Sequence, residues 1–262
     1  MTSSDLLLII ASGLGAGFIN AVSGGGAMFT VPALIFIGLP PGVANGTNRV
    51  AVVIQNIAAL ATYQRLGVAD HRTGLSLAVP ATLGSFFGAL VSIRLDDAQF
   101  RTILGFILLL LVGPILVESR LEVKAAEWRR SAQARWIPWV TFFLIGIYGG
   151  LLQIGVGIFV LMALSITKGF DLVLANSVKV EIVLCITALA LLLFILDGKV
   201  DWSAGLILSV SNAVGASFGV HWGVKKGERW IRIVLTVTVV VMALQLLGGL
   251  SWLSSVFFLE PE

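Results

Sequence analysis

Charged residues are scarce in this sequence of 262 residues. They make up 12% of the chain, whereas a soluble domain usually carries about 25%. One cysteine and two histidines are present, which excludes an intramolecular disulfide and argues against thiolate or histidine metal sites. The sequence also lacks the HExxH, GxSxG and Walker A motifs that mark common catalytic sites. We therefore expect no resident metal, no cofactor and no enzyme activity.

Apolar residues dominate what is present. They form 58% of the chain, and the mean hydropathy is +1.01. Runs such as 103–117 and 183–196 are close to the roughly 17–25 residues that a membrane span requires. The composition therefore predicts an all-α, multi-pass membrane protein with lipid around it. The net charge of +3 is expected to reside in loops that set the orientation, and no nucleic-acid partner is expected.

The chain repeats itself at a fixed offset of 131 residues. Matches of leucine and valine would carry little weight, but glycine, asparagine and aspartate also match. The matching pairs include Gly24 and Gly155, Gly26 and Gly157, Asn45 and Asn176, and Asp70 and Asp201. Such a repeat decides the architecture. It predicts membrane repeats at 1–119 and 137–262, joined by a charged cytoplasmic linker at 120–136.

Each repeat is predicted to hold a short helix pair, broken by glycines, followed by three transmembrane helices. The first pair, 6–22 and 27–39, would measure about 25 and 20 Å, which is short for a hydrocarbon core of roughly 30 Å. The other expected helices are 49–64, 74–94, 101–118, 137–152, 156–167, 177–196, 203–223 and 229–250.

Basic residues favour an inverted arrangement of the two repeats. If each short pair enters and leaves on the same side, most of the 17 basic residues fall in inside loops, as the positive-inside rule requires. These loops are 65–73, 120–135, 168–171 and 225–232. If each pair were instead one broken span, the repeats would be parallel. Whether the pairs are re-entrant or spanning stays open here.

The paired glycine breaks are the strongest candidate for a binding site. Short, glycine-interrupted segments at matching positions of two repeats are typical of transporter sites, because irregular backbone at membrane depth must line a cavity or be buried in protein. The helix after each break would direct free N–H groups and a positive dipole end at an anion. The alternative is that the glycines only permit turns or packing. The candidate residues are Ser23, Gly24, Gly25, Gly26, Gly155 and Gly157.

Two polar stretches, 44–49 and 175–180, are expected to open long helices. Capping accounts for their uncharged members, which are Asn45, Thr47, Asn176 and Ser177. It does not account for Arg49 and Lys179, because a cation near a helix N-terminus opposes the dipole. Two explanations stay open: snorkelling to headgroups, or anion binding in a cavity shared with the glycines and Asn48.

Other intramembrane polar residues have an ordinary explanation in hydrogen bonds between helices. Asn20 and Gln153 lie beside the breaks, so we expect them to line the cavity, whereas Gln55, Asn56 and Asn212 are assigned no such role. Glu181 is a candidate coupling residue for a proton or sodium ion, or a partner of a basic residue on another helix. The GxxxG pairs at 84–88 and 215–219 predict close helix packing.

The motifs around the breaks resemble those of the TauE/SafE family of membrane permeases, also called sulfite exporters. The resemblance rests on Gly24-Gly25-Gly26, Val31-Pro32, Gly38-Leu39-Pro40-Pro41 and Ala44–Asn48, and in the second half on Tyr148-Gly149-Gly150, Gly155-Val156-Gly157 and Ala175–Lys179. It implies a bacterial-type inner membrane and movement of sulfite, sulfonates or other small organic anions. Val156 and Ile158 depart from the small or polar residues common in the family.

These observations together predict a secondary transporter, acting as an exporter, for a small anion such as sulfite or an organosulfonate. A proton or sodium ion is the candidate coupling partner. An anion channel or facilitator of the same fold is the first alternative. A membrane subunit of a larger complex is the second.

Overall fold

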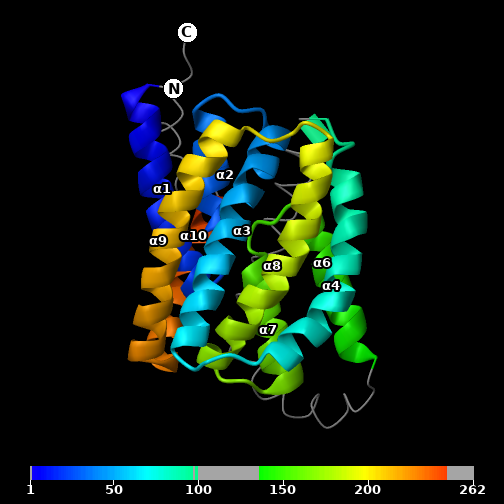
Figure 1. Cartoon of the computed structure of the whole chain (residues 1–262), viewed down its shortest axis with the longest axis vertical. Helices are drawn as coiled ribbons and strands as arrows, with labels where there is room; N and C mark the ends of the chain where they lie inside the picture. The colour runs from blue at the N-terminus through cyan, green and yellow to red at the C-terminus, as the bar shows by residue number, and fades with distance from the viewer. Residues whose placement is uncertain (1, 97, 100–135, 247–262) are drawn as a thin grey trace.

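The computed structural model describes residues 2–96, 98–99 and 136–246, and within them every regular element is a helix (Figure 1). The predicted helix 101–118 and the linker 120–135 lie outside the described residues. The described helices are α1 (Ser3–Val22), α2 (Ala27–Phe36), α3 (Pro41–Arg65), α4 (His71–Ser92), α6 (Ile137–Leu151), α7 (Val156–Lys168), α8 (Leu172–Leu196), α9 (Trp202–Lys226) and α10 (Glu228–Leu246).

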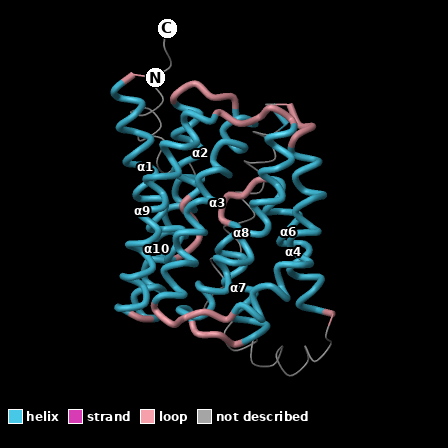
Figure 2. Tube along the Cα trace, viewed as in Figure 1, coloured by secondary structure: helices cyan, strands magenta, loops and turns pink. Residues whose placement is uncertain are grey.

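Two helix pairs are interrupted inside the bundle. Figure 2 shows non-helical segments between α1 and α2 and between α6 and α7 within the body of the molecule rather than at its ends. Three of the four helices are short, since α2, α6 and α7 have 10, 15 and 13 residues. The expectation that both helices of the first pair are short is wrong for α1, which has 20 residues and a length of about 30 Å.

The predicted starts of α3 and α8 are also wrong. Pro41 occupies the first turn of α3, where its fixed φ suits a helix and its missing N–H costs nothing. Asp171 caps α8 by accepting hydrogen bonds from Val173 N and Leu174 N. The four residues expected as N-caps (Asn45, Thr47, Asn176 and Ser177) therefore lie inside the helices. The helix dipole acts mainly within the first turn. Arg49 lies beyond the first turn of α3, so the dipole does not oppose its charge.

The connections divide between the two ends of the bundle. The turns after α3, α7 and α9 lie at the lower end in Figure 1, and the turns after α2 and α8 lie at the upper end. The lower turns are those that the basic residues predict to be inside. Four described helices (α1, α4, α8 and α9) are long and apolar enough to cross a membrane.

Helices α4 and α9 carry equivalent apolar stripes on their outer faces. Both stripes follow a spacing of four residues, which places their members on one face of a helix. The exposed residues are Leu75, Val79, Leu83 and Phe87 on α4, and Leu206, Val210, Val214 and Phe218 on α9. Each α4 residue matches an α9 residue at the offset of the repeat, so both halves present the same kind of surface to lipid.

The GxxxG pairs pack each half against the broken helix of the other half. Gly84 and Gly88 of α4 lie against the backbone of α6, at Phe143 and Ile147. In the same way, α9 lies against α1, with Gly215 beside Leu14 and Gly219 beside Phe18. The predicted close packing is confirmed. Because α4 packs on α6 and α9 packs on α1, each half contacts the broken helix of the other half.

Replacing Gly88 by alanine is expected to destabilise the protein by about 1–3 kcal/mol, the usual cost of overpacking. An added Cβ would overlap the carbonyl oxygen of Ile147, and neither backbone can yield without separating α4 from α6. The measurement is the thermal unfolding midpoint of the purified protein in detergent. An unchanged midpoint would contradict this account of the α4–α6 contact.

Candidate functional site

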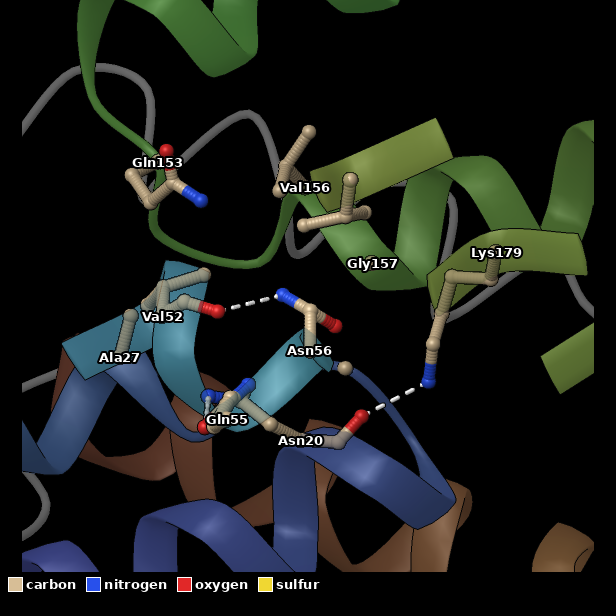
Figure 3. A pocket seen from close by; sticks show the side chains of 11 residues that line it. Asn20, Ala27, Val52, Gln55, Asn56, Gln153, Val156, Gly157 and Lys179 are labelled. Carbon is tan, nitrogen blue, oxygen red and sulfur yellow. Dashed lines mark hydrogen bonds between the residues drawn. The ribbon is translucent and has the colours of Figure 1, made fainter. Parts of the chain in front are cut away.

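One pocket lies where the two breaks meet (Figure 3). It is narrow in this structure, with about 20 Å³ open to the centre of a water molecule. Its lining combines amide side chains, one cation, small aliphatic residues and glycine backbone. The lining residues are Asn20, Gly24, Ala27, Val52, Gln55, Asn56, Gln153, Val156, Gly157, Lys179 and Val183. The pocket therefore draws on α1, α2, α3, α7, α8 and both breaks.

The two breaks touch through glycine backbone. A Cβ added to Gly24 would lie 2.6 Å from the Cα of Gly157, and a Cβ added to Gly157 would lie 2.6 Å from the Cα of Gly24. Gly24 also has a φ of +90°, which an L side chain rarely adopts. The contact thus requires glycine at both positions. The expectation that residues of the two breaks meet at one cavity is met by Gly24 and Gly157.

Amide side chains hold the breaks in place. Asn20 accepts a hydrogen bond from Gly26 N through Oδ1 at 2.6 Å and donates through Nδ2 to Gln55 Oε1 at 3.2 Å. Gln153 has a φ of +64°, and its Nε2 donates to Thr187 Oγ1 at 2.7 Å. A non-glycine residue in this conformation costs roughly 1–3 kcal/mol and is typical of functional sites. Each break is therefore tied to a neighbouring long helix.

Lys179 of α8 is the charged residue of the pocket. Its side chain is 2% exposed, and Nζ donates to Asn20 O at 2.7 Å, Ala21 O at 3.3 Å and Asn176 Oδ1 at 2.5 Å. The first two acceptors are carbonyls of the last turn of α1, where a helix carries its negative dipole end. Lys179 thus stabilises the end of α1 at the break.

Arg49 of α3 does the same for the other broken helix. It is fully buried, and it donates to Gly149 O at 3.1 Å, Gly150 O at 2.6 Å and Gln153 Oε1 at 2.8 Å. Both carbonyls belong to the last turn of α6. The guanidinium also lies 4.6 Å from the ring centroid of Phe194, a cation–π distance. Arg49 does not line the pocket but reaches it through Gln153.

Each half therefore supplies the cation that caps the broken helix of the other half. Two asparagines at matching positions reinforce this arrangement, since Asn45 Nδ2 donates to Leu151 O at 3.1 Å and Asn176 Nδ2 donates to Val22 O at 2.9 Å. Snorkelling does not explain Arg49 or Lys179, because neither side chain reaches the surface. Within the described chain, both cations bind neutral oxygens and neither forms an ion pair with a carboxylate.

The sequence of this chain matches the family model described as "Sulfite exporter TauE/SafE" over residues 9–246. The chain belongs to the TauE/SafE family. The paired glycine breaks and the cations that cap them are therefore features of a member of this family. No solved structure matches this chain.

Curated relatives of this TauE/SafE chain are named as transporters. A "Probable membrane transporter protein" of Haemophilus influenzae is 27% identical over 95% of this chain and 97% of its own length. "Probable membrane transporter protein ORF9" of a Sinorhizobium species is 27% identical over 89% and 88% of the two chains. "Probable membrane transporter protein YfcA" of Escherichia coli K12 is 29% identical over 88% and 86%. This chain is accordingly a multi-pass membrane protein of a transporter family.

The remaining residues expected at the TauE/SafE site lie around the pocket rather than on its wall. Ser23 Oγ donates to Thr238 Oγ1 of α10 at 3.2 Å, and Asn48 Oδ1 accepts from Thr30 Oγ1 of α2 at 2.6 Å. Glu181 faces α4, where its carboxylate meets His71 Nδ1 at 3.2 Å. Gly25, Gly26 and Gly155 belong to the breaks but do not line the pocket.

Gln55 and Asn56 line the pocket, although we expected them only to form hydrogen bonds between helices. Both lie on the face of α3 that follows Asn48 and Val52 at helical spacing, and this spacing was the available signal. Gln55 binds Asn20, as expected of a hydrogen bond between helices, whereas Asn56 donates to Val52 O of its own helix at 2.8 Å. Asn212 is buried on α9 and its side chain has no hydrogen-bond partner in the described chain, so the bond expected for it is not seen.

Proposed function

We propose that this protein is a secondary transporter that exports a small anion, such as sulfite or an organosulfonate, through the pocket between the two glycine breaks. The observation that carries the proposal is that two buried cations have no carboxylate partner in the described chain: Lys179 lines the pocket, and Arg49 binds Gln153 on its wall. A buried charge held only by neutral groups is costly. A bound anion would offset that cost, which favours an anionic substrate.

The backbone at the breaks supports the same assignment. Several of the first N–H groups of α2 and α7 are already bound, such as Gly26 N to Asn20 Oδ1 and Ile158 N to Gly155 O. Both helices begin at the pocket, however, and direct the positive ends of their dipoles toward it. Such N-termini favour anions.

Gly24 and Gly157 cover each other's Cα in this structure, and when the breaks move apart, the absence of side chains lets a small oxyanion approach their backbone closely. The Lys179 ammonium group donates to three oxygens. A bound anion would replace one of these three acceptors.

The proposed architecture is a pair of inverted repeats with re-entrant helix pairs. The connection between α2 and α3 lies at the upper end in Figure 1 and the connection between α7 and α8 at the lower end, as expected if the two pairs enter from opposite sides. The proposed repeats are 1–119 and 137–262, with the cytoplasmic linker 120–136. Such halves can rock about a fixed central site and so alternate access.

The contact between Gly24 and Gly157 favours a transporter over a channel of the same fold. Backbones that touch at the centre of the molecule leave no continuous opening there. In this proposal, transport requires a rearrangement of the tips and saturates with substrate. Coupling to a proton or sodium ion belongs to the proposal, with Glu181 as the coupling residue.

Uptake of radiolabelled sulfite into liposomes containing the purified protein tests this function. Wild type is expected to show saturable uptake that unlabelled sulfoacetate reduces and acetate does not. Lys179→Gln keeps a polar group but removes the charge, and is expected to lower uptake by about tenfold or more, since loss of one buried charge interaction is worth about 2 kcal/mol or more.

The matched control is Lys168→Gln on α7, which removes the charge of an exposed lysine and is expected to leave uptake unchanged. The elution profile of each variant in size-exclusion chromatography establishes that it is folded. Absence of flux in wild type for sulfite, sulfate, sulfoacetate and acetate would contradict the proposed function. Such a result, together with tight co-purification of another protein, would favour a subunit of a larger complex.

A further inference from the structure

A carboxylate–imidazole pair joins the two halves below the pocket. His71 Nδ1 of α4 lies 3.2 and 3.3 Å from the two carboxylate oxygens of Glu181 on α8. The Glu181 side chain is 8% exposed, whereas that of His71 is 44% exposed. The imidazole thus lies between a buried carboxylate and the water at the lower end of the bundle.

We propose that this His71–Glu181 pair is the proton-binding site that couples anion transport to a proton gradient, a proposal that rests on the transport function proposed above. An imidazole can bind and release a proton, whereas a lysine or arginine partner would keep its positive charge beside Glu181. Buried carboxylates that pair with a titratable group at membrane depth are typical of proton relays.

The hydrogen bonds around His71 indicate where the proton binds. Gln64 Nε2 lies 3.3 Å from His71 Nε2, and with the amide donating, Nε2 is the acceptor and Nδ1–H donates to Glu181. A proton arriving from the lower end binds at Nε2, while the exposed Gln64 turns its amide oxygen toward it. The imidazolium then pairs with the carboxylate. Loss of that proton leaves Glu181 facing a neutral ring, which weakens the contact.

The position of Glu181 explains how the proton would influence the pocket. Lys179 of the pocket and Glu181 lie on the same helix two residues apart, so their side chains do not share a face. Glu181 faces Gly74 of α4, where an added Cβ would overlap the carboxylate. The strength of the α4–α8 contact therefore depends on the protonation of the pair, and a shift of α8 carries Lys179 with it.

Other ionisable groups near the pair have other partners or positions. Lys179 is directed at α1, and Asp70 accepts from Thr73 N and Thr73 Oγ1. Cys185 lies one turn beyond Glu181 on the same helix, and Tyr63 of α3 packs in the apolar cluster around Val180. Exposed cations at the lower end include Arg65, Arg72 and Lys168 around the turns beside α4 and α8, and Lys225, Lys226 and Arg229 around the turn after α9. The described partner of Glu181 is a nitrogen, whereas sodium would require several oxygens, so the pair favours a proton.

Two assays on the same liposomes separate coupling from transport. Exchange of radiolabelled sulfite against unlabelled sulfite at equal concentrations requires the pocket but no gradient. Accumulation of radiolabelled sulfite under an imposed pH gradient, corrected for protein-free vesicles, requires coupling. Glu181→Gln and His71→Gln are expected to retain exchange, because neither residue lines the pocket, and to lose accumulation, so that the ratio of inner to outer sulfite falls to one.

His221→Gln is the matched control, because His221 is the second histidine of the chain, is exposed on α9 and lies outside the pair. It is expected to accumulate sulfite as wild type does. His71 is at the surface, so His71→Gln keeps the test valid if Glu181→Gln fails to fold. Accumulation retained in both variants, or driven by a sodium gradient instead, would overturn the coupling proposal. Absence of exchange in wild type would instead contradict the proposed transport function itself.

Discussion

Replacing Arg49 by leucine is expected to lower the free energy of unfolding by about 2–4 kcal/mol. Each buried acceptor that is left unpaired costs about 1–3 kcal/mol. Hydrogen bonds within membranes contribute toward the lower end of that range. Arg49 binds two carbonyls at the end of α6 and the amide of Gln153. Leucine fills much of the space but leaves all three oxygens without a donor. The unfolding midpoint in detergent measures the effect.

Two further variants give this prediction its control. Arg65→Leu makes the same change at an exposed position at the end of the same helix, and is expected to shift stability by less than about 0.5 kcal/mol. Arg49→Lys keeps the charge, but an ammonium cannot match the fork of a guanidinium, so we expect an intermediate loss. Equal midpoints for wild type and Arg49→Leu would show that Arg49 does not hold the end of α6.

Replacing Gly157 by alanine is expected to reduce sulfite uptake on the order of tenfold to a hundredfold, because a displacement of about 1 Å in a pre-organised site has effects of that size. The new Cβ would stand 2.6 Å from the Cα of Gly24. Because the atoms nearest to the new Cβ are backbone atoms of Gly24, which cannot rotate away, the two breaks must move apart. The pocket between the breaks then changes shape. Initial uptake rates in liposomes give the measurement.

Gly15→Ala serves as the control for Gly157→Ala. An added Cβ at Gly15 meets no atom within 4 Å, and alanine is favoured over glycine inside a helix by roughly 0.5–1 kcal/mol. We expect unchanged uptake and equal or higher stability. If Gly157→Ala also transported at the wild-type rate, the contact of the breaks would have no part in the transport path.

Long apolar runs, the repeat and the glycine breaks were readable from the sequence because they depend on local composition and spacing. Hydropathy predicts helices wherever lipid surrounds the chain, and the offset of 131 residues predicts that whatever one half builds the other builds again. The lining role of Asn20 and Gln153 also followed from their position beside the breaks. The starts of α3 and α8 were predicted less well. The residues that begin these helices, Pro41 and Asp171, precede the polar stretches that were expected to begin them.

Periodicity and hydropathy are properties of neighbouring residues, so the amino-acid sequence was enough to predict a membrane-embedded helical repeat with two candidate sites at equivalent breaks. The three-dimensional arrangement was needed to show that the cation of one half caps the broken helix of the other, and that Glu181 pairs with His71. These contacts join residues one hundred or more positions apart. They arise because α4 packs on α6 and α9 on α1, and the spacing of residues along the chain does not specify which helices interlock.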